Sequence, residues 1–201
     1  MPSIYQLKPA FQGLLRPLVR ALARAGVTAN QVTLLAAALS ILLGLVLALW
    51  PACRLAWLAL PVLLFVRMAL NAIDGMLARE HDMKSPLGAF LNELGDVVSD
   101  AALYLPFALL PLISSWLAVL AVVAALLTEF TGVVAIQAGA TRRYDGPLGK
   151  SDRAFGYGAM GLVLGLGVAP GIWTSIVLAL ILLLSFVTIV NRLRRALAVR
   201  A

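Results

Sequence analysis

The residues that could carry chemistry gather in residues 67–100, a short part of a strongly apolar chain. A first set of polar and small residues would share one helix face, or lie beside it: Asn71, Asp74, Gly75, Ala78 and Arg79. A second set recurs every four residues and would form one stripe on a second helix: Gly88, Asn92, Asp96 and Asp100. A short polar loop, residues 80–87, joins the two helices, so they run antiparallel and their stripes can face each other.

Carboxylate and amide oxygens on two facing helices are suited to binding a hard divalent cation. Mg²⁺, Mn²⁺ and Ca²⁺ all prefer such oxygen ligands. The chain has one His and one Cys, so no cluster of softer ligands competes. A divalent-metal site is therefore one interpretation of the two stripes.

Two other interpretations of these polar residues remain open. A carboxylate within a membrane helix costs several kcal/mol, so it needs a partner or a purpose. The first alternative is structural: Asn71 and Asn92 would hydrogen-bond across helices, and Arg67 or Arg79 would neutralise Asp74. The second is the path of a small ion-coupled transporter.

The composition predicts an all-α integral membrane protein that forms a single domain over residues 1–201. Hydrophobic residues make up 62% of the chain and charged residues 12%, whereas soluble domains have about a quarter charged residues. The formal net charge is +7. In a membrane protein such charge marks the cytoplasmic side and contacts anionic lipid. We expect no nucleic-acid partner, because no separate basic domain is present.

The hydrophobic pattern predicts six transmembrane helices after an N-terminal interfacial amphipathic helix. Residues 3–25 are too charged to cross a bilayer and fit a helix lying in its interface. Six apolar stretches of about the length needed to span then follow: 31–50, 55–79, 88–110, 112–140, 154–168 and 173–190. A polar loop, residues 141–153, separates the fourth and fifth spans.

The basic residues predict the orientation of these spans. With six spans, one side holds Lys8, Arg16, Arg20, Arg24, Arg79, Lys84, Arg142, Arg143, Lys150, Arg153, Arg192, Arg194, Arg195 and Arg200. The other side holds only Arg54. Both termini and the acidic stripes would therefore face the cytoplasm, where we expect a polar cavity. This pattern suits a bacterial inner (cytoplasmic) membrane.

Residues 71–96, NAIDGMLAREHDMKSPLGAFLNELGD, resemble the signature of the CDP-alcohol phosphotransferase (CDP-alcohol phosphatidyltransferase) family. That signature is D-x2-D-G-x2-A-R-x8-G-x3-D-x3-D, and its spacing is matched throughout. GVTANQVT, residues 26–33, is similar to the segment that opens the family's first span, with Ala29 where proline is usual. The resemblance extends over nearly the whole chain.

The resemblance implies a membrane transferase of phospholipid biosynthesis. Such an enzyme moves a phosphatidyl or similar phospho-group from a CDP-activated lipid to an alcohol and releases CMP. It also implies Mg²⁺ or Mn²⁺ (alternatively Ca²⁺) as one or two bound ions, and a homodimer. Asp74 and Asp96 would be metal ligands, and Asp96 also the catalytic base. Gly75, Ala78, Arg79 and Gly88 would border the pocket for the nucleotide donor.

Two departures from the signature bear on catalysis. Asn71 and Asn92 stand where the family has its first and third Asp, so the site has two fewer negative charges. Asp100, on the same stripe, could join the two asparagines as a metal ligand, and Glu93 and Glu129 are further compensating acids. We expect one tightly bound ion. A non-transferring CDP-lipid binder or hydrolase of the same fold is the alternative.

Basic residues in the stretch 141–153 could hold a phosphate on the acceptor alcohol or on the lipid. They are Arg142, Arg143, Lys150 and Arg153. The alternative is ordinary positive charge on the cytoplasmic side of a membrane protein. The acceptor itself is not identified by these residues.

Overall fold

The structure, a computed structural model, describes residues 4–198 and the side chains of residues 9–198. The side chain of Lys8 and the whole of Arg200 lie outside these ranges, so their predicted cytoplasmic location is not addressed. The described chain is all-helical: α1 (Ile4–Arg24), α2 (Ala29–Leu49), α3 (Arg54–Glu80), α4 (Pro86–Tyr104), the 3₁₀ helix η1 (Leu105–Leu109), α5 (Ser115–Gln137), α6 (Lys150–Gly165) and α7 (Ile172–Leu197).

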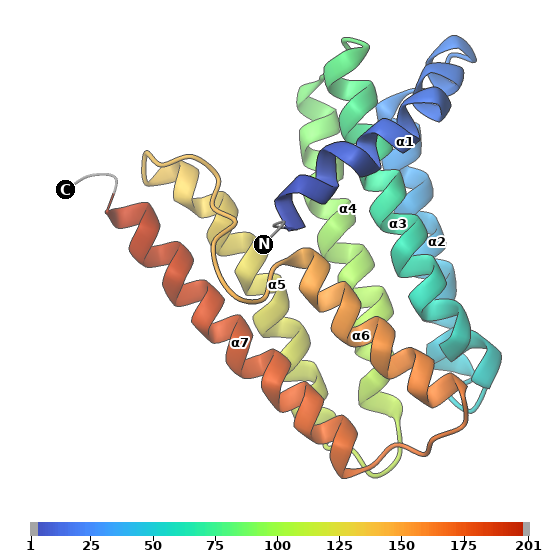
Figure 1. Ribbon diagram of the computed structural model, residues 1–201. Coiled ribbons are helices and arrows are strands. Elements are labelled where there is room, and N and C mark those ends of the chain that lie inside the picture. Colours follow the sequence, from blue (N-terminus) through green and yellow to red (C-terminus); the bar gives the residue numbers. More distant parts are fainter. Residues whose placement is uncertain (1–3, 199–201) are drawn as a thin grey trace.

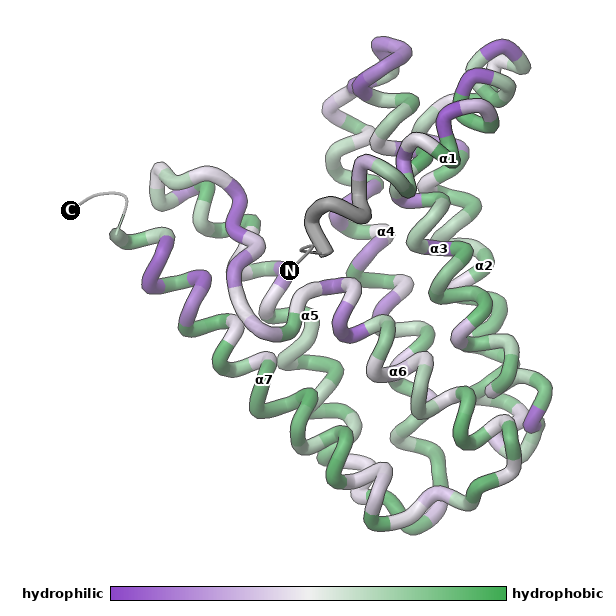
Figure 2. Tube along the Cα trace, in the orientation of Figure 1, coloured by the Kyte–Doolittle hydropathy of each residue, from purple (hydrophilic) through white to green (hydrophobic). Residues whose placement is uncertain are grey.

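The helices form a V whose two arms diverge towards one end (Figure 1). In one arm α2 packs against both α3 and α4, and in the other α5 packs against α7. Helix α6 packs against α3, and α1 lies across the upper part of the first arm (Figure 1). Hydrophobic residues dominate the closed end, whereas polar residues gather towards the open ends of the arms (Figure 2).

A hydrophobic cluster joins the arms at the closed end. The Trp57 and Phe107 rings meet edge to face with their centroids 4.8 Å apart, and the Tyr104 and Tyr157 rings stack at 3.8 Å. All four side chains are almost fully buried. Aromatic pairs of this kind contribute about 0.5–1.5 kcal/mol beyond burial of their area. The cluster therefore fixes the closed ends of α3, α4 and α6 relative to one another.

Helix α4 begins at Pro86, two residues before the predicted span. The Ser85 hydroxyl accepts a hydrogen bond from the Gly88 backbone N–H at 2.9 Å, which caps the helix. Proline is favoured in the first turn because the N–H that it lacks has no helical partner there. The loop between α3 and α4 therefore comprises residues 81–85 rather than 80–87.

The prediction of one continuous helix over residues 88–110 was wrong at its C-terminal end. Helix α4 ends at Tyr104, and the 3₁₀ helix η1 follows. Pro106 lies at the start of η1 and has no N–H to donate. This residue accounts for the change from α-helix to 3₁₀ helix.

The predicted polar loop, residues 141–153, was also too long. Helix α6 begins at Lys150, and the Asp152 carboxylate accepts a hydrogen bond from the Gly149 N–H at 2.8 Å. An acidic residue in the first turn also complements the helix dipole. Lys150 and Arg153 therefore belong to the first turn of α6, which holds them more firmly than a loop would.

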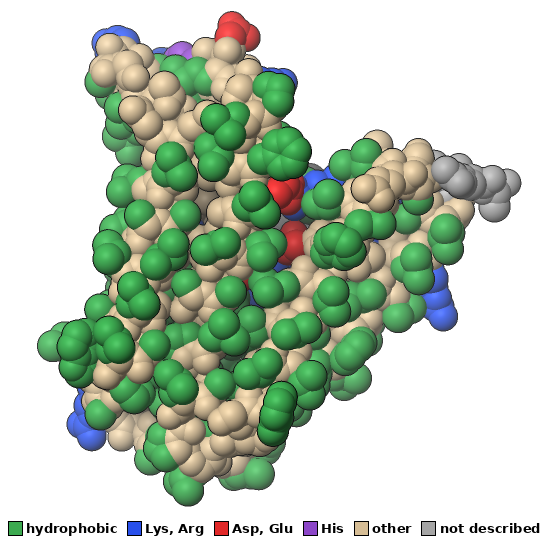
Figure 3. All heavy atoms as spheres, turned by 180° about the vertical axis from the view of Figure 1, so that it is seen from behind, with side chains coloured by type: hydrophobic (Ala, Val, Ile, Leu, Met, Phe, Trp, Pro, Cys, Tyr) green, Lys and Arg blue, Asp and Glu red, His purple; other side chains and the backbone are tan. Residues whose placement is uncertain are grey.

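Within the part of the chain that the structure describes, four helices have the length and apolar composition needed to cross a membrane: α2, α3, α5 and α7. Helix α4 contains three acidic residues, and α6 has only 16 residues. Many large hydrophobic side chains lie on the outside of the bundle, such as Leu42, Phe65 and Leu183. Figure 3 shows this apolar surface from behind, with charged side chains deep in a hollow between the two arms.

Helix α1 contacts the rest of the bundle through one part of its surface. Val19 is fully buried in a cluster with Ile73 and Leu77 of α3. Arg16 donates two hydrogen bonds to the Glu80 carboxylate, at 3.0 and 3.2 Å, and this bonding raises the pKa of the Arg16 guanidinium. These contacts hold α1 against the C-terminal end of α3.

Candidate functional site

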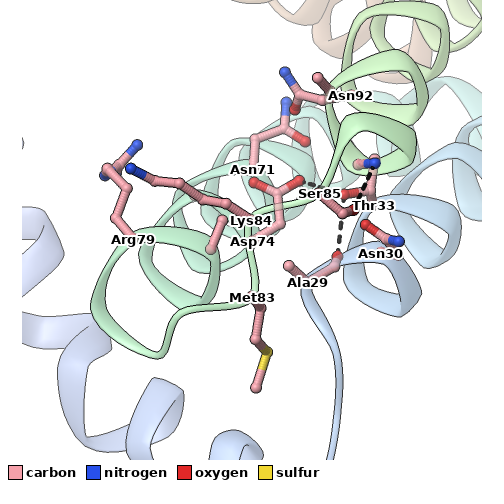
Figure 4. Close-up of a pocket in the computed structure, with 14 residues that line it drawn as sticks. Ala29, Asn30, Thr33, Asn71, Asp74, Arg79, Met83, Lys84, Ser85 and Asn92 are labelled. Carbon is pink, nitrogen blue, oxygen red and sulfur yellow. Dashed lines mark hydrogen bonds between the residues drawn. The ribbon is translucent and has the colours of Figure 1, made fainter.

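A cavity of about 380 Å³ lies where α2, the end of α3 and the start of α4 meet (Figure 4). Its walls include most of the residues that the sequence singled out on the two helices: Asn71, Asp74, Gly75, Ala78, Arg79, Gly88 and Asn92. Other wall residues were not predicted from the sequence, among them Asn30, Thr33 and Ser85. The two predicted polar stripes do face each other, and α2 supplies the third wall.

The Asp74 carboxylate is buried beside α2. The Thr33 hydroxyl lies 2.7 Å from Asp74 Oδ2, so it holds this carboxylate in place from the neighbouring helix (Figure 4). The only sequence signal for Thr33 was its position in the GVTANQVT segment. Asn71 and Asn92 line the same cavity as Asp74 (Figure 4).

Asp96 lies one turn beyond Asn92 and is held by three donors on a single oxygen. Its Oδ1 accepts hydrogen bonds from Asn71 Nδ2 at 3.1 Å, from the Arg67 guanidinium at 3.3 Å and from Lys150 Nζ. Two of these donors are cations that lie on α3 and α6. The predicted metal ligand and base is therefore already ion-paired within the chain.

Asp100 is buried between two guanidinium groups. Arg67 lies 2.5 Å from Oδ1, and Arg153 lies 3.3 Å from Oδ2. The side chain is only 3% exposed and does not line the cavity. The stripe of four-residue steps predicted Asp100 beside the metal ligands, whereas the structure brings it into contact with arginines.

The two other candidate compensating acids also face arginines. Arg142 bridges Glu93 on α4 and Glu129 on α5. Glu129 further contacts Arg153 at 2.9 Å, and Arg192 of α7 lies 3.7 Å away. Neither acid lines the cavity beside Asp74.

Of the four basic residues proposed for phosphate binding, three contact the acidic residues described above and one does not. Arg142, Lys150 and Arg153 contact these acids, whereas Arg143 pairs with Asp145 at 2.8 Å. We call the following residues the ionic cluster: Arg67, Glu93, Asp96, Asp100, Glu129, Arg142, Lys150, Arg153 and Arg192.

The ionic cluster joins both arms of the V. It contains five bases and four acids, a formal excess of one positive charge. Arg192 was predicted only as one of the basic residues on the cytoplasmic side, yet its guanidinium is buried and donates to the Thr128 carbonyl. Buried charges of this kind need partners, because an unpaired charge in the interior is strongly destabilising.

The cavity side chains fit one hard cation. Asp74 supplies a carboxylate, and Asn71 and Asn92 can supply amide oxygens, which are suitable ligands for Mg²⁺ or Mn²⁺. Within the described residues no group of three or more His, Cys, Asp and Glu side chains has the geometry of a metal site. The acids that could have held a second ion contact Lys and Arg side chains instead.

Sequence comparison matches residues 26–195 to the CDP-alcohol phosphatidyltransferase family. The chain is 47% identical over 199 residues to the inner membrane protein YnbA of Escherichia coli, covering 99% of this chain and 98% of that protein. It is 35% identical over 104 residues to a phosphatidylinositol phosphate synthase of Corynebacterium glutamicum, covering 52% of this chain and 45% of the synthase.

Solved structures share the fold. The phosphatidylinositol phosphate synthase PgsA1 of Mycobacterium tuberculosis, in complex with manganese and citrate, superimposes with a TM-score of 0.73 at 23% identity, over 90% of this chain and 87% of that one. The same protein with CDP-DAG bound gives a TM-score of 0.72 at 22% identity, over 90% and 92% of the two chains. These structures support the helical arrangement described above.

Proposed function

This chain belongs to the CDP-alcohol phosphatidyltransferase family, and we propose that the cavity between α2, α3 and α4 is its active site. Membership makes the protein an integral membrane, metal-dependent transferase of phospholipid biosynthesis. Its donor is a CDP-activated lipid, its acceptor is an alcohol, and CMP is released. The observation that carries the proposal is that seven signature residues, from both halves of the motif, line one cavity.

The donor would lie in the cavity with its cytidine diphosphate against α3. Gly75 and Ala78 have little or no side chain and leave room for the nucleotide. Arg79 and Lys84 also line the cavity, and their positive charges would attract the donor phosphates. Gly88 would allow close approach on the α4 side. CDP-diacylglycerol is the donor that we propose, since a PgsA1 structure of the same fold contains CDP-DAG.

Asp74, Asn71 and Asn92 are the residues that would hold a divalent cation. Manganese is bound in a PgsA1 structure, and Mg²⁺ or Mn²⁺ suits these oxygen ligands. When bound, such an ion offsets the charge of the pyrophosphate and of the leaving phosphate. Asp96 and Asp100 were also predicted as ligands. We keep Asp96 as a residue beside the ion. Asp100 instead contacts Arg67 and Arg153 outside the cavity, and we give it a supporting role within the ionic cluster.

Asp96 would accept the proton of the attacking alcohol. Its three donors all lie on Oδ1, which leaves Oδ2 to act as the base. Arg142, Arg143, Lys150 and Arg153 would border the acceptor, including any phosphate that it carries. An acceptor phosphate would have to compete with the carboxylates that these side chains already contact.

We further propose six spans, α2 to α7, within a single domain of residues 1–201. Helix α1 would lie in the membrane interface, and both termini and the cavity would face the cytoplasm. The inner membrane of a bacterium is the compartment, as for the relative YnbA. A homodimer is the expected assembly in the bilayer.

CMP release by the purified protein in lipid nanodiscs tests the function. The assay would supply CDP-diacylglycerol, Mg²⁺ or Mn²⁺, and alcohols in pairs with and without a phosphate. We expect metal-dependent CMP release that one alcohol stimulates and that Asp96→Ala abolishes. Asp82→Asn is the matched control, because Asp82 has a left-handed φ of 55° that asparagine adopts readily, and it does not line the cavity.

Other outcomes of this assay would separate the alternatives. Release that needs no alcohol would identify a hydrolase. Cytidine nucleotide binding without CMP release would identify a non-transferring binder, which the asparagines at positions 71 and 92 make the main alternative. Absence of both binding and release would refute the proposed function.

A further inference from the structure

Lys150 and Asn71 both donate to the same carboxylate oxygen of Asp96. Lys150 lies in the first turn of α6, 54 positions from Asp96, and its ammonium group forms an ion pair with Asp96 Oδ1. Asn71 of α3 donates its amide to the same oxygen at 3.1 Å. Arg67, one turn before Asn71, adds a second positive charge at 3.3 Å.

These contacts differ from those that a cation bridge would need. If position 71 held a carboxylate, it would face the Asp96 carboxylate, and a cation between them would be required to offset their repulsion. An amide at position 71 removes that requirement, because Asn71 donates a hydrogen bond directly to Asp96. The ammonium of Lys150 then supplies the positive charge that a bridging ion would have brought.

A second divalent ion at Asp96 would be opposed by two cations already in contact with this carboxylate. Arg67 is only 4% exposed, so its charge is weakly screened by water. Lys150 is 31% exposed, but α6 packs against α3 and holds the first turn of α6 near the site. Among residues 9–198, no Lys or Arg side chain forms a hydrogen bond with the Asp74 carboxylate on the other side of the cavity.

We propose that Lys150 is a built-in cation that takes the place of a second metal ion at Asp96. The site then binds a single divalent ion, held by Asp74 with Asn71 and Asn92. Lys150 acts as a positioning residue that holds the Asp96 carboxylate in its orientation. This inference rests on the proposed function only in taking the cavity as a metal site, and metal binding can be measured without turnover.

Counting bound Mn²⁺ tests the proposal. Protein in nanodiscs would be dialysed against a Mn²⁺ series, bound metal counted by mass spectrometry, and coupling between ions examined by electron paramagnetic resonance. The wild-type protein should bind one ion per chain and show no Mn–Mn coupling. In Lys150→Met, a second ion should bind about tenfold more tightly or better, a change of the size seen when groups around metal ligands are altered.

The double variant Asn71→Asp with Lys150→Met should bind two coupled ions, because it restores a carboxylate and removes the competing charge. Arg195→Met is the matched control for net charge. Arg195 is 66% exposed and pairs with Asp145, away from Asp96, so its loss should leave one bound ion. Thermal unfolding of each variant would verify that it remains folded.

Three results would overturn the inference. They are two tightly bound ions in the wild-type protein, no bound ion at all, or an unchanged count and affinity in both Lys150 variants. CMP release measured on the same samples separates this question from the proposed function. One bound ion without CMP release would refute the transferase and leave the role of Lys150 intact.

Discussion

Replacing Arg153 with methionine should destabilise the protein more than any replacement of an exposed arginine. The Arg153 side chain is fully buried, and one of its terminal nitrogens lies 3.3 Å from Asp100 Oδ2 and 2.9 Å from Glu129 Oε1. The other terminal nitrogen donates to Thr128 Oγ1 at 2.8 Å and to the Leu148 carbonyl at 3.4 Å. Arg153 therefore connects α4, α5 and α6 at the centre of the ionic cluster.

The size of the effect follows from the partners that remain. Removing one member of a buried ion pair costs about 3–5 kcal/mol, because the other charge stays buried without compensation. In the variant, Asp100 keeps its contact with Arg67, and Glu129 keeps its contact with Arg142. We therefore expect a loss of stability at the lower end of that range. A loss of about 3 kcal/mol corresponds to a Tm lower by about 6–12 °C for a chain of this length.

The assay is thermal unfolding in detergent, followed by fluorescence-detected size-exclusion chromatography, with Arg16→Met as the matched control. Arg16 pairs with Glu80, but both side chains are well exposed, at 43% and 36%, so their pair contributes little. Adding Glu129→Gln to Arg153→Met should recover part of the lost stability, since it removes a buried carboxylate that has lost one of its cationic partners.

Two results would refute this reasoning about the ionic cluster. One is an Arg153→Met shift no larger than that of Arg16→Met. The other is a double variant whose loss equals the sum of the two single losses, which would mean that Arg153 and Glu129 contribute independently.

Four further predictions concern the cavity and two helix glycines, one in α5 and one in α1. Asp74→Asn should abolish both Mn²⁺ binding and CMP release, because Asp74 is the carboxylate that lines the cavity. Chelation with EDTA should stop CMP release, and added Mn²⁺ should restore it. Gly132→Ala should destabilise the protein by about 1–3 kcal/mol, since its Cβ would lie 2.6 Å from the Arg143 carbonyl oxygen. Gly13→Ala should stabilise it by about 0.5–1 kcal/mol, because a Cβ there meets nothing within 4 Å and alanine favours the helix.

Each of these predictions has its own check. Metal counting and CMP detection on Asp74→Asn should be accompanied by a melting curve, and a folded variant that still binds Mn²⁺ would remove Asp74 from the metal site. Recovery of activity after EDTA without added metal would contradict a metal-dependent reaction. Equal melting temperatures for the two glycine variants would show that a Cβ at position 132 fits beside the Arg143 backbone without strain.

The sequence by itself predicted the helical class, the antiparallel course of the two helices around residues 67–100, and seven of the residues that line the cavity. The length of an apolar stretch and a four-residue spacing reflect the geometry of one helix, so both can be recognised within a single segment of the sequence. Some predicted helix boundaries were wrong because Pro106 and Asp152 each change the structure of a single helical turn. A hydrophobicity pattern averages over more residues than that.

Only the tertiary structure decided which charges meet. Thr33 reaches Asp74 across 41 positions, and Lys150 reaches Asp96 across 54, so neither contact leaves a periodic signal. Asp100 shares a stripe with Asp96, yet it lies between arginines of two other helices rather than in the cavity. Helix spacing determines which side chains share a face, but the packing of α2, α5 and α6 determines what that face meets. The local pattern therefore identified the candidate metal ligands, and the packing of distant helices provided the cations that compete for them.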